Sequence, residues 1–314
     1  MNKSSSFRNQ AGAGPHVALV AVQLIFGTWP IFGKIALRAL PSTGLVALRV
    51  TGAALAFLLL LRSRGRLNVP RRSDLARLAF YSLLGVVLNQ FLFVKGLALS
   101  TVVNATLLST SIPVFALLVG AAVGYEKLTL RAVAGTCVAA AGVVILVDPF
   151  RANLSGGTAL GNVLLVANTV AYGAYIALSQ DVFRRYGALT AMTWVFAFGS
   201  VIALPFGGYY LAQVDPQTVG WEVLLAVAYI IVVPTVGAYY LNAWALERVT
   251  PSTVAVYIYL QPLIAFALAP LFLGADERWG VRHVLAAALI FTGVAVVTLR
   301  RRREGAAREV SVAP

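Results

Sequence analysis

Long apolar stretches, separated by short polar loops, run through almost the whole chain. A stretch of about 17 to 25 apolar residues is long enough to cross the hydrocarbon core of a bilayer as one helix. Lipid offers no hydrogen-bond partner to a peptide group, so a spanning segment must satisfy its backbone within its own helix. We therefore predict an all-α integral membrane protein with ten transmembrane helices. They are expected near residues 17–39, 45–61, 76–97, 102–123, 131–148, 158–179, 189–211, 221–244, 252–273 and 282–299.

The composition supports lipid as the main solvent of this chain. Of its 314 residues, 60% are hydrophobic and only 11% are charged, whereas a soluble domain carries roughly a quarter charged residues. The single cysteine, Cys137, excludes a disulfide framework within one chain and any CxxC metal or redox motif. We predict no cofactor and no metal site.

The net charge of +14 raises the alternative of a nucleic-acid-binding protein, which would need a basic soluble face with interleaved aromatic residues. The basic residues instead lie between the apolar stretches. The termini and one set of alternate loops hold 18 of the 25 Lys and Arg residues, the other loops hold four, and three lie inside spans. By the positive-inside rule, both termini are expected in the cytoplasm of a multi-pass inner (plasma) membrane protein, with residues 300–314 as a cytoplasmic basic tail. No nucleic-acid partner is expected.

The chain contains an internal repeat, which we expect to cover residues 17–148 and 158–299. The first copy includes KGLALSTVVNATLLSTSIPVFALLVGAAVGYEKLTLRAVAGTCVAAAGVVIL, and the second includes NAWALERVTPSTVAVYIYLQPLIAFALAPLFLGADERWGVRHVLAAALIFTGVAVV. The matched pairs are Ala98 with Ala245, Pro113 with Pro262, Glu126 with Glu277, and Gly142 with Gly293. Five spans per copy is an odd number, so the second copy enters the membrane inverted. Inverted repeats with a site at their interface are a common transporter architecture.

At these residues the sequence resembles the drug/metabolite transporter superfamily, in its EamA-type branch of paired five-helix repeats. The resemblance covers nearly the whole chain and is carried by FGTWPIFGKIALRALPSTGLVALR, STSIPVFALLVGAAVGYEKLT and YLQPLIAFALAPLFLGADERW. The stretch LNQFLFVKGLALS is similar to plant metabolite transporters of the same superfamily. Glu277 departs from the pattern, because it lies one residue later than a simple LGE motif would place it. The resemblance implies export or exchange of amino acids, their aromatic relatives or similar metabolites through a cavity between the repeats.

Polar and aromatic residues recur at helical spacing within the spans, as the lining of a solute path requires. Two stripes occupy equivalent spans of the two repeats, and they contain Gln23, Gly27, Pro30 and Lys34 in the first span and Asn168, Tyr172, Tyr175 and Ser179 in the sixth. Aromatic faces with amide ends suit planar or zwitterionic solutes. Polar contacts that only hold helices together are the alternative. The predicted substrate-binding residues are Gln23, Trp29, Lys34, Asn89, Gln90, Asn104, Tyr172, Tyr175, Tyr239, Asn242, Tyr257 and Gln261.

Three basic residues, Lys34, Arg49 and Lys95, fall inside spans, toward their outer ends. A cation at mid-bilayer costs about 2.5 to 3.5 kcal/mol on insertion scales. The simpler interpretation is that all three snorkel to the outer interface. The alternative is a positive outer vestibule that attracts a substrate carboxylate, with Lys34 as its first candidate because Lys34 belongs to a polar stripe.

Four prolines inside spans are expected to interrupt their helices and free backbone groups. We favour a hinge role over direct binding for Pro30, Pro113, Pro234 and Pro262.

The sequence favours an alternating-access carrier of small-molecule solutes over two other classes. A membrane-embedded enzyme would need a nucleophile with its base, paired carboxylates or a metal cluster, and none of these is evident. A non-transporting membrane scaffold or subunit would need no polar stripe. No Asp or Glu lies near the middle of a span, so a midplane proton relay is not visible. Proton coupling stays open beside facilitated diffusion and exchange driven by the solute gradient.

Overall fold

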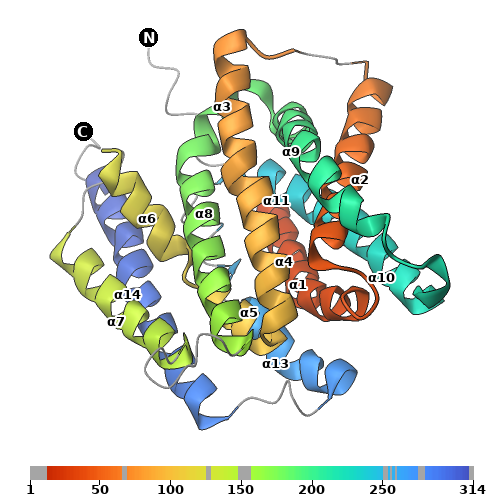
Figure 1. Cartoon of the computed structure of the whole chain (residues 1–314). Coiled ribbons are helices and arrows are strands. Elements are labelled where there is room, and N and C mark those ends of the chain that lie inside the picture. Colours follow the sequence, from red (N-terminus) through yellow and green to blue (C-terminus); the bar gives the residue numbers. More distant parts are fainter. Residues whose placement is uncertain are drawn as a thin grey trace.

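The computed structural model describes residues 13–65, 69–124, 129–147, 157–249, 254, 257–258, 260–274 and 280–310. Throughout this part of the chain the regular structure is helical, in one bundle (Figure 1). The α-helices are α1 (Ala13–Ala36), α2 (Ser42–Ser63), α3 (Arg72–Ser82), α4 (Asn89–Leu99), α5 (Val102–Ser109), α6 (Ile112–Ala122), α7 (Leu130–Val147), α8 (Gly157–Tyr186), α9 (Ala188–Leu211), α10 (Trp221–Ile230), α11 (Ala238–Leu246), α13 (Leu260–Leu273) and α14 (Val281–Val310). Two π-helical segments, η1 (Leu83–Leu88) and η3 (Ile231–Gly237), and a short 3₁₀ turn, η2 (Pro216–Thr218), complete the order.

The helices confirm the prediction of an all-α membrane protein with ten spans. Seven of them, some joined through a π-helical segment or a short break, are long and apolar enough to cross a membrane. Three shorter apolar helices, at Val133–Ile145, Leu260–Leu273 and Val281–Gly293, coincide with the remaining three predicted spans. The α14 backbone continues to Val310, through most of the predicted tail at 300–314. Glu126 and Glu277, which the repeat pairs with each other, lie outside the described residues.

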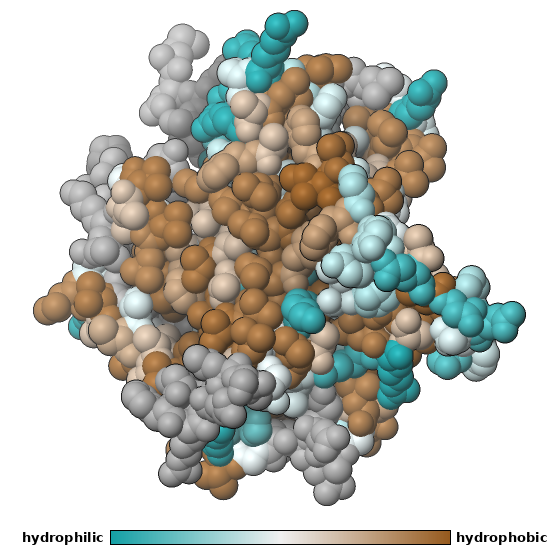
Figure 2. All heavy atoms as spheres, viewed as in Figure 1, coloured by the Kyte–Doolittle hydropathy of each residue, from teal (hydrophilic) through white to brown (hydrophobic). Residues whose placement is uncertain are grey.

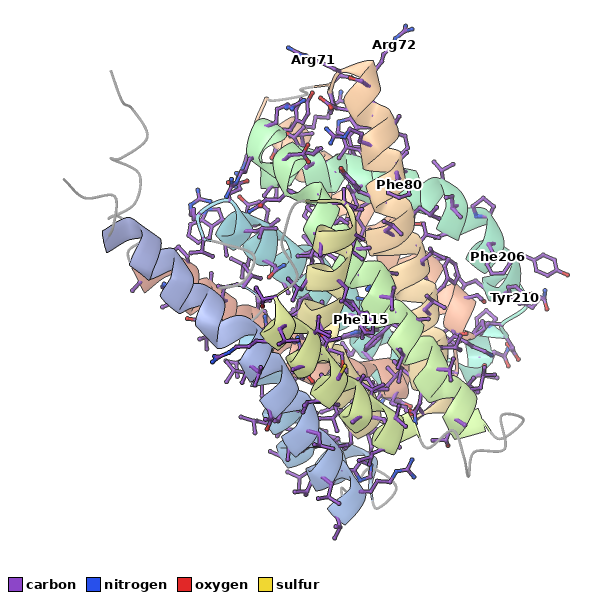
Figure 3. All side chains as sticks on the ribbon, turned by 90° about the vertical axis from the view of Figure 1, so that its left-hand side faces the viewer. Arg71, Arg72, Phe80, Phe115, Phe206 and Tyr210 are labelled. Carbon is purple, nitrogen blue, oxygen red and sulfur yellow. The ribbon has the colours of Figure 1, made fainter. Side chains whose placement is uncertain are left out.

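The outer surface of the bundle is apolar, as contact with lipid requires. Large hydrophobic side chains such as Leu59 on α2 and Val201 on α9 are exposed. Figure 2 shows hydrophobic side chains over most of one face, with hydrophilic ones mainly toward its edges. In Figure 3, Arg71 and Arg72 mark one end of α3, while Phe80 lies farther along the same helix. Charged residues therefore bound the apolar surface at the helix end.

Helices of one repeat pack mainly on helices of the other, in pairs that correspond under exchange of the repeats. The second spans meet as α2 with α9, and the fifth spans meet as α7 with α14. The contact of α4 with α8 is matched by the contact of α11 with α1, and that of α6 with α8 by that of α13 with α1. The two copies thus form one interlocked bundle with approximate twofold symmetry, and each first-span helix touches two spans of the opposite copy.

Helix ends are fixed by local chemistry that the sequence carries. The hydroxyl of Thr101 accepts the backbone N–H of Asn104 at 3.0 Å and so caps α5. Gly187, at a φ of 78°, makes the sharp turn from α8 to α9, a conformation that favours glycine. The Glu247 carboxylate accepts the N–H of Ala188, which is the first residue of α9. An acidic group at a helix N-terminus is favourable for the helix dipole.

Gly207 allows α9 to approach α2 closely, and this contact gives a stability prediction. A Cβ at Gly207 would lie 2.3 Å from the carbonyl oxygen of Thr43, whereas a Cβ at the neighbouring Gly208 would find nothing nearer than Leu204 Cδ1 at 3.9 Å. We expect Gly207→Ala to cost about 1–3 kcal/mol through overpacking and to lower the melting midpoint of the purified protein in detergent. Gly208→Ala should leave it unchanged or raise it, because alanine gains roughly 1 kcal/mol over glycine inside a helix. Equal midpoints for the two variants would contradict this account of the interface.

Candidate functional site

A buried arginine on α2 forms the centre of the polar interior. Arg49 is only 1% exposed. Its Nε donates to the Thr235 hydroxyl in η3 at 3.1 Å, and its Nη1 donates to the side-chain oxygen of Gln90 on α4. Its guanidinium carbon lies 3.7 Å from the centre of the Trp29 ring on α1, within range for a cation–π contact. Four spans therefore meet at one positive charge.

The contacts continue from Arg49 across both repeats. The amide nitrogen of Gln90 donates to the hydroxyl of Tyr239 on α11 at 2.8 Å, and that hydroxyl donates to the side-chain oxygen of Asn89 at 3.3 Å. The amide nitrogen of Asn168 on α8 donates to the backbone carbonyl of Asn89 at 2.8 Å. We call Arg49, Gln90, Asn89, Tyr239 and Asn168, together with Thr235 and Trp29, the central cluster.

The two π-helical segments lie beside residues of the central cluster. Gln90 is the second residue after η1, and Tyr239 is the second residue after η3. Both residues belong to the third span of their repeat, and their side chains hydrogen-bond to each other. A π-helical turn shifts the register of the residues that follow it and leaves backbone carbonyls for other donors, which is why such turns are frequent at functional sites. The Thr235 hydroxyl uses one of them, the carbonyl of Ile230, at 2.6 Å.

Aromatic rings surround the central cluster. The ring of Tyr239 makes edge contacts with Phe26 at 5.8 Å and Phe196 at 5.3 Å, measured between ring centres. Trp29 stacks on Phe93 at 6.0 Å. Edge-to-face and stacked rings at these separations attract one another. The interior of the bundle therefore offers amides, one cation and aromatic faces at the same place.

The sixth-span stripe points inward, and its tyrosines pack beside η1. Tyr172 and Tyr175 stack at 5.7 Å. A Cβ at Gly85 in η1 would lie 2.4 Å from the Tyr175 ring, so glycine is what lets this ring lie against the π-helical backbone. Asn168, Tyr175 and Ser179 are buried and Tyr172 is half-buried. The prediction that the stripe faces the interior is confirmed, but a role in binding stays a prediction.

Other predicted residues lie in separate groups along α1. Toward its start, His16 Nδ1 lies 2.7 Å from the Tyr257 hydroxyl. Two turns farther on, the amide nitrogen of Gln261 donates to the side-chain oxygen of Gln23 at 2.6 Å. These contacts tie α1 to the ninth span. Asn242 is half-buried on α11, outside the central cluster.

The opposite end of α1 carries a second polar group. Lys34 donates to the backbone carbonyl of Ser100. The Ser100 hydroxyl donates to the side-chain oxygen of Asn162 at 2.5 Å, and the Asn104 amide donates to the same oxygen at 3.2 Å. This group joins α1, the α4–α5 connection and α8. Lys34 and Asn104 thus belong to this second polar group.

The contact between α1 and α10 is made by uncharged groups. The Thr28 hydroxyl lies 2.8 Å from the Tyr229 hydroxyl. The Phe32 ring centre lies 4.2 Å from the Tyr229 ring centre.

The structure corrects the snorkelling interpretation for one of the three basic residues. Lys95 is exposed, as that interpretation requires. Arg49 instead is buried and points into the bundle. It lies seven residues after the start of α2, well inside the span, where η3 and α4 provide its acceptors. Those acceptors are distant in sequence, so the span alone gave no sign of them.

The four prolines differ in their effect on the backbone. Pro113 follows a break, because α5 ends at Ser109 and α6 begins at Ile112. Pro234 lies within η3, and Pro262 is the third residue of α13. Pro30 does not interrupt its helix, contrary to expectation: α1 runs through it, and it is buried. A single missing N–H is tolerated where neighbouring helices cover the site. The hinge roles stay predictions.

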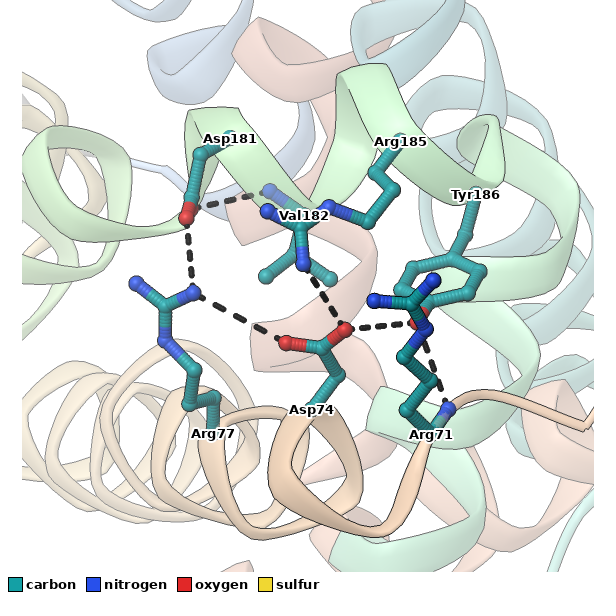
Figure 4. A network of polar contacts seen from close by, with 7 residues as sticks. All are labelled: Arg71, Asp74, Arg77, Asp181, Val182, Arg185 and Tyr186. Atoms are coloured by element: carbon teal, nitrogen blue, oxygen red, sulfur yellow. Dashed lines mark hydrogen bonds and ion pairs between the residues drawn. The ribbon is translucent and has the colours of Figure 1, made fainter.

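A charged network joins α3 to α8 at the helix ends (Figure 4). Asp74, whose side chain is 3% exposed, accepts hydrogen bonds from the Tyr186 hydroxyl at 2.6 Å and from Arg185 at 2.9 Å. Arg77 pairs with Asp181 at 2.9 Å and lies 3.8 Å from Asp74. The sequence analysis did not predict this network, since its residues lie on two helices that are more than 100 residues apart in the chain.

Comparison with known proteins agrees with the repeats seen in the sequence. The EamA-like transporter family matches the chain twice, at residues 15–148 and 159–299. An uncharacterized transporter of Archaeoglobus fulgidus is 27% identical over 92% of this chain and 98% of its own length. The WAT1-related protein At3g18200 of Arabidopsis thaliana is 24% identical over 92% of this chain and 82% of its own.

Two further likenesses concern function and fold. A Streptantibioticus cattleyicolor protein named "Probable terminal-alkyne amino-acid exporter" is 25% identical over 91% of this chain and 96% of its own. A protein of known crystal structure shares the fold with a TM-score of 0.64 at 21% identity, over 93% of this chain and 98% of its own.

The Asp74 network gives a second stability prediction. Asp74→Asn removes the charge to which Arg185 and Tyr186 donate, and we expect it to lower stability because the Asp74 side chain is only 3% exposed. Asp181→Asn is the matched control: Asp181 is 43% exposed, and an exposed pair contributes about 1 kcal/mol or less. The melting midpoint in detergent should therefore fall clearly for the first variant and little for the second. The reverse order would show that Asp74 does not hold α3 against α8.

Proposed function

Because this chain belongs to the EamA-like transporter family, we propose that it moves amino acids, aromatic compounds or related small metabolites across the membrane by alternating access around the central cluster. The chain is a multi-pass membrane transporter and not an enzyme. The observation that carries the finer proposal is the hydrogen bond between Gln90 and Tyr239, which joins the third span of one repeat to the third span of the other. A site at the interface of inverted repeats becomes accessible from either side when one repeat rocks against the other.

The chemistry of the central cluster supports this class of solute. The amides of Asn89 and Gln90 and the hydroxyl of Tyr239 can exchange their mutual hydrogen bonds for those of a polar solute. Rings such as Trp29 offer flat apolar contact to its body. The residues bind one another with short hydrogen bonds in this structure, so opening the path would separate them. We propose that the protein exports or exchanges its solute, and the similarity to a protein named as an amino-acid exporter supports export.

The proposed boundaries and orientation follow the sequence. We place the first repeat at residues 17–148, the second at 158–299 and the basic tail at 300–314. Both termini would face the cytoplasm of the inner or plasma membrane, since the Lys and Arg residues gather on that side. The Asp74 network and the polar group around Lys34 then lie at the cytoplasmic and outer ends, and each would break as the path opens on its side.

Counterflow in liposomes tests the transport proposal. Purified protein is reconstituted into vesicles preloaded with amino acids, aromatic metabolites or nucleobases, with and without a pH gradient, and uptake of the labelled solute is followed. One solute class should accelerate uptake, and a dependence on the gradient would indicate proton coupling. Gln90→Ala should reduce the rate at least about tenfold by removing a central hydrogen-bonding group. Leu224→Ala on the exposed face of α10 should not. No counterflow by well-folded protein across the panel would favour a non-transporting membrane scaffold or subunit.

Cysteine labelling tests the orientation. In a Cys137→Ala background, Gln217→Cys lies in the loop before α10 and Ser63→Cys at the end of α2, and both positions are exposed. We expect a membrane-impermeant maleimide to label Gln217→Cys in intact cells and Ser63→Cys only after lysis. The opposite pattern would place the termini outside.

A further inference from the structure

We infer that Arg49 binds the carboxylate of the transported solute, and that its charge makes the carrier an exchanger whose empty form returns slowly. This inference rests on the transport function proposed above and assigns its solute class and mode. It follows from a buried cation whose neighbours, among the described residues, are neutral.

The charge on Arg49 is permanent and costly where it lies. An arginine side chain stays protonated inside proteins, and a buried charge is tolerated only if it is paired or well hydrogen-bonded. Arg49 is 1% exposed and belongs to a membrane-spanning helix. A permanent charge at such a place is a functional-site hypothesis in its own right.

The protein supplies Arg49 with dipoles and a ring, but with no carboxylate that the structure describes. Its acceptors are the hydroxyl of Thr235 and the amide oxygen of Gln90, and its face lies on Trp29. The carboxylates of Asp74, Asp181 and Glu247, which form the ion pairs of the described residues, all lie at helix ends. The positive charge is therefore solvated by neutral groups rather than neutralised.

The guanidinium also has binding capacity left. The hydrogen bonds to described residues use Nε and Nη1, which leaves the Nη2 amine without an acceptor among them. Arginine matches a carboxylate through two parallel N–H donors, and such bidentate pairs are among the strongest polar contacts in proteins. A solute carboxylate would take Nη2 and displace the Gln90 oxygen from Nη1. Gln90 would keep its bond to Tyr239, and the rings of Trp29 and Tyr239 would contact the body of the solute.

The same charge sets the mode of transport. With a carboxylate bound, the site carries a neutral pair, which crosses a low-dielectric region at lower cost than a lone cation. An empty carrier must reorient with Arg49 unneutralised while its contacts to Gln90 and Thr235 change. Reorientation of the empty form is therefore the slow step, and the carrier exchanges one carboxylate for another.

The first test compares acids with their own amides in the native protein. Wild-type vesicles are assayed by counterflow with phenylalanine, alanine, 3-phenylpropanoate, benzoate and lactate, each beside its primary amide. At least one acid should accelerate uptake, and its amide should be at least about tenfold weaker, the loss expected when a charge-assisted pair becomes a neutral contact. The amino acid and the simple acids then separate a zwitterionic from an anionic solute. Equal acceleration by an amide, or by a nucleobase alone, would overturn the inference and leave the transport function standing. Absence of all counterflow would count against both.

The second test changes Arg49 and measures exchange. Efflux of preloaded labelled acid is followed into buffer with or without unlabelled acid. Wild type should respond to external acid by at least about tenfold, since the loaded form returns faster. Arg49→Gln should lose both this stimulation and the preference for acid over amide, whereas Arg49→Lys keeps the charge and should keep the stimulation with weaker binding. Equal wild-type efflux with and without external acid would overturn exchange.

A purely structural Arg49 remains distinguishable even if Arg49→Gln folds poorly. Melting of the wild-type protein in detergent is then measured with each acid and its amide. The acid alone should raise the midpoint, because it binds only the folded protein. If an acid and its amide have equal effects on the melting and on the counterflow of the wild-type protein, Arg49 has only a structural role.

Discussion

A permanent positive charge inside a membrane bundle constrains everything packed around it. Arg49 can neither lose its proton nor reach water, so its acceptors must come from other spans. Thr235 supplies one from the second repeat and Gln90 supplies another from the first. Trp29 covers the flat face of the guanidinium. The requirement to solvate one cation therefore selects which spans meet at the centre, and it places the polar groups where a solute would be held.

The two repeats meet this requirement through matched distortions. The third span of each repeat contains a π-helical segment, η1 or η3, and the side chains of Gln90 and Tyr239, which follow the two segments, hydrogen-bond to each other. A regular helix would carry Gln90 and Tyr239 at a different angle. The π-helical segments interrupt the regular backbone hydrogen bonding of these spans, and side chains replace part of it. Asn168, for example, donates to the backbone carbonyl of Asn89 just after η1.

Hydropathy, repeat spacing and helical periodicity predicted the ten spans, the paired copies and the inward face of the stripe that includes Asn168 and Tyr175, because these properties depend on local sequence. The pairing of Arg49 could not be predicted in this way, since it depends on the depth of Arg49 along α2 and on acceptors 41 and 186 residues away in the chain. The π-helical segments likewise have no clear sequence signature. Pro30 shows the opposite error: proline usually breaks a helix, yet here tertiary packing keeps α1 continuous.

The pair α3 and α8 and the pair α1 and α10 correspond to each other in the two repeats, but different kinds of contact hold them together. The ends of α3 and α8 are joined by the ion pairs of Asp74, whereas α1 and α10 meet through the Thr28 and Tyr229 hydroxyls and the Phe32 ring. Charge pairs weaken as ionic strength rises, and ring contacts hardly respond to it. An exactly symmetric pair of repeats would make the two states of the carrier equal in free energy. In the proposed alternating-access cycle the different contacts would make the two states unequal in free energy, so the resting side of the carrier would depend on the salt concentration at one face of the membrane.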